Sequence, residues 1–124
     1  MRVLGAYVPS AWQSEIIETE IRAFLDSCCR AERVSVRIPM GIPPALDNLQ
    51  WHHDGGGVEG TTRHMVVWAS EQPTELRGPD GDAIETRAYD VIWFNNDACW
   101  HRQPAGTDAS RRWFVAVRCS GVIA

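Results

Sequence analysis

The sequence predicts a mainly β domain with an N-terminal helix, and among β folds a double-stranded β-helix (jelly roll) fits it best. Two observations lead to this prediction. One segment near the N-terminus has helical periodicity. After residue 33, about eight short segments rich in β-branched and aromatic residues follow, with turn residues every eight to twelve positions or so. This spacing is typical of a sandwich or barrel and not of alternating strand and helix units.

The N-terminal third provides the helix. Residues 2–8 form a short apolar segment that we expect to be a strand ending at Pro9, and Ser10 is the expected helix cap. Residues 12–28 then show helical spacing of apolar side chains, which predicts a helix lying against a sheet. Those side chains are Ile16, Ile17, Ile21, Phe24 and Leu25.

The remainder reads as strands separated by Gly, Pro, Asn and Asp. The segment at 72–76 is expected to be an edge strand, and 78–82 is a strong turn signal. The expected strands are 34–38, 49–54, 61–69, 72–76, 84–86, 89–94, 99–102 and 112–119.

Length and composition indicate one domain over residues 1–124, with residues 1–33 packing on a jelly-roll core at 34–119. The content of 44% hydrophobic and 23% charged residues is that of a soluble globular protein. The net charge of −4, with no basic block, gives no strong nucleic-acid signal. No run of apolar residues approaches the length of a membrane span, and we expect no signal peptide. The four cysteines contain no Cys-x-x-Cys pair, so we expect a cytoplasmic protein with reduced thiols.

The candidate chemistry centres on His52, Asp54 and His101. His52 and Asp54 are two residues apart, so on a strand both side chains leave the same face. Two imidazoles and one carboxylate can occupy one face of a six-coordinate ion, as in the facial triad of non-heme Fe(II) oxygenases. A His-x-Asp pair on its own is common by chance, and its alternative interpretation is a turn or a solvated strand end.

The order of these residues along the chain resembles the Fe(II)/2-oxoglutarate-dependent dioxygenases, both prolyl hydroxylase-like and AlkB-like. The resemblance covers roughly residues 34–119. It rests on Trp51-His52-His53-Asp54, on the run from Asp90 to Asn95 before the distal His101, and on Arg112 at the head of the last strand. It implies a jelly roll in which His52, Asp54 and His101 hold Fe(II) at the open mouth, while 2-oxoglutarate chelates the metal and its far carboxylate meets an arginine.

The alternation of faces along the last strand helps to indicate which arginine would meet the far carboxylate. Arg111 shares its register with Trp113, Val115 and Val117, which look like a packed layer against another sheet or the helix. Arg112 shares its register with Phe114, Ala116 and Arg118, and is therefore the favoured contact for the carboxylate. A pair of arginines on this strand also resembles the AlkB-type demethylases. Arg118 is thus either a second co-substrate contact or a solvated strand end.

By the same resemblance, 2-oxoglutarate and O₂ would be converted to succinate and CO₂ while the substrate is hydroxylated. Small-molecule, nucleotide and peptide substrates all stay open, as does a homodimer. Two alternative functions remain: a cupin-like metal-binding jelly roll without 2-oxoglutarate, and a non-enzymatic jelly-roll module. The sequence also departs from the family pattern, because Tyr89 stands where a glycine usually precedes Asp90.

Other aromatic and imidazole side chains are expected to be structural. His53 should face away from His52, and His64 has no partner that the sequence reveals. Trp68, Trp93 and Trp100 are expected in the core, with pocket lining as the alternative. Asn95 is expected either to lie near the metal or to shape a turn.

Overall fold

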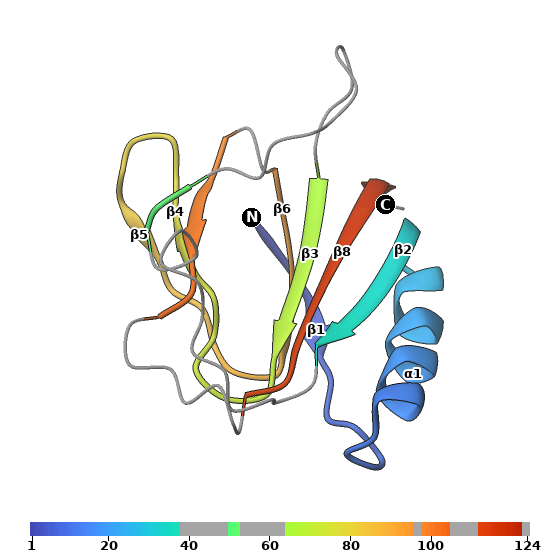
Figure 1. The fold of residues 1–124 in the computed structure, drawn as a ribbon. Helices are drawn as coiled ribbons and strands as arrows, with labels where there is room; N and C mark the ends of the chain where they lie inside the picture. Colours follow the sequence, from blue (N-terminus) through green and yellow to red (C-terminus); the bar gives the residue numbers. More distant parts are fainter. Residues whose placement is uncertain (38–49, 53–63, 96–97, 105–111, 123–124) are drawn as a thin grey trace.

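The computed structural model describes residues 1–37, 50–52, 64–95, 98–104 and 112–122; in β2 and in residues 118–122 only the backbone is described. These residues form one helix and eight strands (Figure 1). In chain order the elements are β1 (Arg2–Ala6), α1 (Ser14–Asp26), β2 (Cys29–Arg37), β3 (His64–Ala69), β4 (Glu75–Arg77), β5 (Ala83–Ile84), β6 (Asp90–Asn95), β7 (Trp100–Arg102) and β8 (Phe114–Val122).

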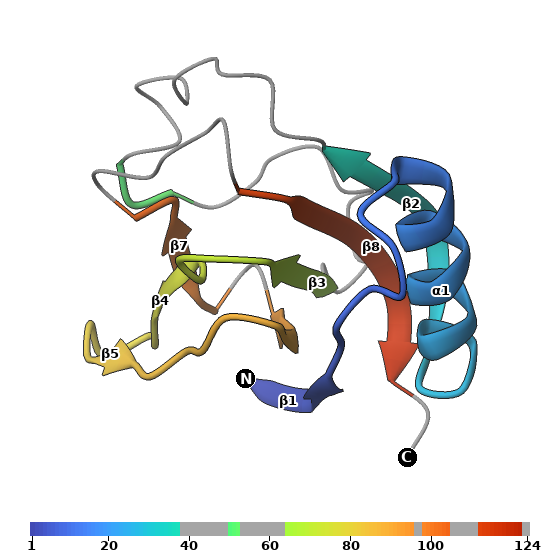
Figure 2. The ribbon, with the colours of Figure 1, turned by 90° about the horizontal axis from the view of Figure 1, so that it is seen from below.

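The strands form two antiparallel sheets, so the prediction of a mainly β fold with one helix is confirmed. The large sheet has the order β1-β6-β3-β8-β2 and the small sheet has the order β5-β4-β7. The helix lies on the side of the large sheet that faces away from the small sheet (Figures 1 and 2). The prediction that the strand at 72–76 lies at the edge of a sheet is wrong, because β4 lies between β5 and β7. Pro73 precedes β4 and removes no hydrogen bond from its ladder.

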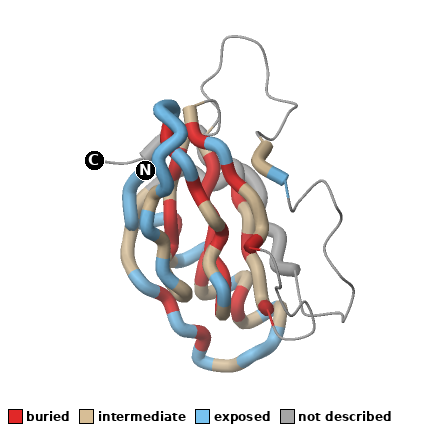
Figure 3. The backbone as a smooth tube through the Cα atoms, turned by 90° about the vertical axis from the view of Figure 1, so that its left-hand side faces the viewer, coloured by how far each residue is buried: buried red, intermediate tan, exposed pale blue. Residues whose placement is uncertain are grey.

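Two layers of apolar side chains hold these elements together. Figure 3 shows the buried positions distributed along the strands. The first layer joins the helix to the large sheet, and burying each of the helical residues Ile17, Ile21 and Leu25 contributes about 1.5–3 kcal/mol. The second layer lies between the two sheets, since it combines side chains of β3, β4 and β6. It consists of Met65, Val67, Leu76, Ile92, Phe94 and Cys99.

Ser10 does not cap the helix. The residue at the cap position is Gln13, whose side chain makes no capping hydrogen bond. Instead, the Ser10 amide and hydroxyl donate to the Glu20 carboxylate at 3.0 and 2.9 Å, and the Tyr7 hydroxyl donates to the same oxygen at 3.1 Å. These bonds from Ser10 lower the pKa of Glu20, and burial raises the pKa of Tyr7. Ser10 therefore attaches the chain before the helix to the side of the helix. Its place three residues before the cap residue Gln13 gives no indication of this role.

Tyr89 has a left-handed backbone, with a φ of 68°. A side chain in this conformation costs about 1 kcal/mol, and glycine avoids the cost. The backbone of Tyr89 is held on both sides, because its amide donates to the Ala69 carbonyl and its carbonyl accepts from the Tyr7 amide, both at 2.8 Å. Its ring packs 6.3 Å from that of Trp68 and 6.4 Å from that of Trp12. The aromatic contacts thus offset the backbone cost at this position.

Glycine and alanine at position 89 should separate these two effects. Tyr89→Gly and Tyr89→Ala both lose the ring contacts, but only glycine relieves the left-handed backbone. We expect Tyr89→Gly to be more stable than Tyr89→Ala by about 1 kcal/mol, measured by urea unfolding with equal m-values. An alanine variant as stable as the glycine variant would show that the backbone here carries no strain.

No helix in the described ranges is long and apolar enough to cross a membrane. Among these residues, Cys28 and Cys99 are free thiols.

Candidate metal and anion site

The structure brings His52 and His101 side by side, although they are far apart in the sequence. Their backbones form an antiparallel bridge in which each amide donates to the other's carbonyl, at 3.0 and 3.1 Å. Residues directly opposite each other in such a pair project from the same face. Their imidazole ring centroids are accordingly 4.3 Å apart.

This shared face is the one that looks toward the large sheet. His101 is only 6% exposed, and its ring lies 5.3 Å from that of Phe94 on β6. The partner of His101 on β4 is Leu76, which belongs to the core between the sheets. Both imidazoles therefore project into the space between the two sheets.

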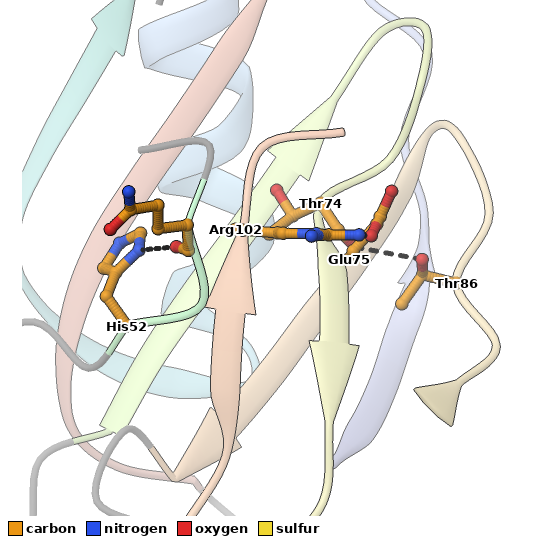
Figure 4. A network of polar contacts seen from close by, with 6 residues as sticks. His52, Thr74, Glu75, Thr86 and Arg102 are labelled. Atoms are coloured by element: carbon orange, nitrogen blue, oxygen red, sulfur yellow. Dashed lines mark hydrogen bonds and ion pairs between the residues drawn. The ribbon is translucent and has the colours of Figure 1, made fainter. Parts of the chain in front are cut away.

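A backbone contact sets which nitrogen of His52 carries a proton. Nδ1 of His52 lies 2.7 Å from the carbonyl oxygen of Gln50 (Figure 4). A carbonyl oxygen can only accept, so Nδ1–H is the donor. Nε2 of His52 then carries the lone pair, as in metal-binding histidines whose other ring nitrogen donates to a carbonyl. The donor chemistry at this position fits a metal ion.

Several predicted site residues cannot be placed. Asp54, His53 and Arg111 lie outside the described residues, and only the backbone is described for Arg118. Within the described ranges, no three His, Cys, Asp or Glu side chains gather closely enough to hold a metal ion. The proposed set contains only two ligands from those ranges, His52 and His101. Its third member, Asp54, is the one not described.

Arg112 is a buried cation with neutral partners. It is 5% exposed, and its Nε donates to the Gln72 carbonyl at 2.8 Å while Nη2 donates to Thr74 Oγ1 at 3.3 Å. Its guanidinium carbon lies 4.9 Å from the ring centroid of Phe114. No carboxylate of the described residues forms an ion pair with it. Burial lowers the pKa of Arg112 to about 10, so the group is still positively charged at neutral pH.

The alternation expected along the last strand is present in the side chains that the structure describes. Val115 and Val117 belong to the helix-facing core, and Trp113 packs against it. Phe114 and Ala116 pack instead against the core between the sheets. The two-residue alternation therefore predicted correctly which of these side chains lie on each face of β8.

The guanidinium of Arg112 lies on the same side of the small sheet as the imidazoles. Thr74 and Leu76 are buried at 4% and 1%, whereas Glu75 between them is partly exposed, so Thr74 and Leu76 share the inner face. Leu76 is the partner of His101, which places Thr74 two residues, about 7 Å, along from the histidine pair. Arg112 thus places a positive charge beside Thr74, on the same face of the small sheet as the imidazoles of His52 and His101.

Of the tryptophans expected in the core, two lie there and one does not. Trp68 is 1% exposed in the helix-facing core, where its Nε1 donates to the Tyr7 carbonyl at 3.0 Å, and Trp93 packs against the same core.

The core position expected for Trp100 is wrong, because this side chain is 42% exposed. Its neighbour His101 takes the inner face, so Trp100 must take the outer one. The His64 ring lies 4.5 Å from that of Trp93, tilted by 35°, on the opposite side of the large sheet from His101. Asn95 Oδ1 accepts from the Ala98 amide at 3.3 Å, which is a turn contact.

Sequence reasoning missed the groups that orient the site. Thr74 could have been found from its alternation with Leu76 in a short strand. The carbonyls of Gln50 and Gln72 could not have been found, because every residue has one and only the folded chain selects them.

No protein-family model, curated protein or solved structure matches this chain.

Proposed function

We propose that this chain is an Fe(II)/2-oxoglutarate-dependent oxygenase that hydroxylates its substrate. The observation that carries the proposal is the adjacency of the His52 and His101 imidazoles, with the Nδ1 proton of His52 held by the Gln50 carbonyl. Supporting observations come from the strand pairing and from the buried charge of Arg112.

The strand pairing supports a double-stranded β-helix as the scaffold. A jelly roll is a long antiparallel ribbon wrapped on itself, so its first strand pairs with its last and each inner strand pairs correspondingly. From β2 onward, this chain pairs β2 with β8, the 50–52 segment with β7, β3 with β6, and β4 with β5. The N-terminal β1 extends the large sheet beside β6. In the proposed scaffold, His52 and His101 are on the second and seventh strands of the ribbon.

His52, His101 and Asp54 would hold the metal. The Gln50 carbonyl keeps the proton on Nδ1 of His52, which directs the Nε2 lone pair away from the backbone. Phe94 packs beside His101 and limits the rotation of its ring. The carboxylate of Asp54 would share the face of His52 if the strand continues through position 54. Such a set leaves coordination positions open for other ligands.

Arg112 and Thr74 would bind the far carboxylate of 2-oxoglutarate. Among the described residues this buried guanidinium has neutral partners and no counter-charge, and a carboxylate would supply one with matched geometry. The Thr74 hydroxyl accepts from Arg112, which leaves its own hydrogen to donate to the same anion. When bound together, Fe(II) and 2-oxoglutarate would supply O₂ activation, with succinate and CO₂ as products and hydroxylation of a substrate C–H bond. The protein's own part is to orient these groups and to exclude water around them.

The test adds Fe(II) and 2-oxoglutarate separately and together to purified protein without oxygen. We expect a weak visible metal-to-ligand band only when both are present, and slow release of succinate once air is admitted. Metal binding without a 2-oxoglutarate-dependent band or succinate would contradict the proposal and would favour the cupin-like alternative. A chain that binds no metal at all would be the non-enzymatic module.

A further inference from the structure

The segment that carries His52 is attached to the small sheet by a backbone bridge and also by a side-chain contact. That contact is on the outer face of the sheet, opposite the face from which His52 projects. Within the described residues, its only backbone pairing is the bridge to His101 on β7. β7 is paired on its other side with β4. Among the residues that the structure describes, the 50–52 segment therefore lies beside β7 with this bridge as its backbone contact.

Trp51 is the residue next to His52, and alternation places its side chain on the outer face. Two guanidinium carbons, those of Arg77 and Arg102, each lie 4.4 Å from the centroid of the Trp51 ring. Both distances are well inside the range of a cation–π attraction. Arg77 belongs to β4 and Arg102 to β7, so these three side chains connect the 50–52 segment to both neighbouring strands.

Arg102 is itself held in place. Its Nε donates to the Glu75 carboxylate at 2.8 Å, and Glu75 is the residue opposite it on β4 (Figure 4). Both side chains are about one-third exposed, so the pair lies at the surface of the small sheet. The ion pair keeps the planar guanidinium extended across the sheet, where the indole ring can stack on it.

We infer that Trp51 is a positioning residue for His52, with Arg77 and Arg102 as the cations that hold its ring. A rotation of the segment, or a slip of one residue, would move His52 to the outer face and break both contacts at once. The clamp on the outer face thereby fixes the inward direction of the imidazole and its Nδ1 contact with the Gln50 carbonyl. As a role in metal binding, this inference rests on the proposed function.

The experiment uses three variants of the full chain. Trp51→Ala removes the ring, whereas Trp51→Phe keeps an aromatic face for the cations. Trp100→Ala is the matched control, because Trp100 also occupies the outer face next to a histidine. Its strand β7, however, is paired with β4 on one side and with the 50–52 segment on the other. Nitrogen-15 NMR of the metal-free proteins reports the His52 tautomer, and Co(II) titration reports metal affinity.

In the wild type, Trp51→Phe and Trp100→Ala, we expect the proton of His52 to stay on Nδ1. In Trp51→Ala we expect a mixture of both tautomers and Co(II) binding weaker by roughly 10-fold, the lower end of the effect seen for groups that orient metal ligands. The inference is overturned if Trp51→Ala keeps a single tautomer, or if Trp100→Ala scrambles it to the same degree. This tautomer comparison decides the inference whether or not cobalt binds. A wild type that binds no Co(II) would contradict the proposed function instead.

Discussion

His101→Ala and His52→Ala should each lower the affinity for Fe(II) or Co(II) by at least about 100-fold and abolish succinate production. Each removes a metal ligand, and even groups that only orient ligands contribute 10- to 100-fold or so to affinity. His52 is only half-buried, so His52→Ala should fold even if the loss of the buried His101 disturbs the small sheet. Metal titration followed by thermal melting of the same samples separates lost binding from lost folding.

His64→Ala is the control for this comparison. His64 also presents an imidazole, but it packs against Trp93 on the side of the large sheet that faces the helix. This variant should bind metal like the wild type, although it loses some packing. If His64→Ala lost metal and His101→Ala kept it, the ion would lie on the wrong side of the large sheet for the proposed site.

Arg112→Met should weaken 2-oxoglutarate binding by roughly 100-fold while leaving the affinity for Co(II) alone unchanged. The loss corresponds to about 3 kcal/mol, the size of one charge-assisted contact to a carboxylate. Calorimetric titration of 2-oxoglutarate into the Co(II)-loaded protein without oxygen measures this change. Arg87 provides a matched control, because its side chain is 77% exposed beside Glu85 and Arg87→Met removes the same charge from the surface.

The free energy of unfolding of Arg112→Met should equal that of the wild type or exceed it by up to about 1 kcal/mol. Burial depresses the pKa of Arg112 to about 10, so the folded state disfavours its charged form. The free-energy cost of burying the charge is therefore present at every pH below about 10. It becomes smaller as the pH rises from that value toward the pKa that the arginine has in the unfolded chain. Methionine removes the cost at neutral pH and roughly keeps the volume. An Arg112→Met protein with unchanged 2-oxoglutarate affinity would show that the buried cation serves another purpose.

Local periodicity predicted the parts of the structure that depend on it. The helical spacing of Ile17, Ile21 and Leu25 identified the buried face of α1, and alternation identified the two faces of β8. The strand lengths were less accurate, because the end of a strand depends on its partner. β8, for example, continues to Val122 alongside β2, beyond the expected end at residue 119.

Contacts between distant segments could not be predicted in this way. No local pattern indicates that Ser10 donates to Glu20, or that Arg77 and Arg102 meet on Trp51. The adjacency of His52 and His101 was implied only by a resemblance in the order of residues, since sequence spacing alone does not state which strands pair. The backbone cost at Tyr89 is likewise set by tertiary contacts, which hold a tyrosine where glycine would be unstrained.

The central claim is that one metal ion joins the imidazoles of His52 and His101 to the carboxylate of Asp54, next to the guanidinium of Arg112. A crystal grown or soaked without oxygen in Fe(II) and 2-oxoglutarate tests it most directly. The expected density shows a single ion bonded to those three side chains, with 2-oxoglutarate extending from the ion toward Arg112. An ion bound elsewhere, or 2-oxoglutarate bound away from Arg112, would contradict the claim.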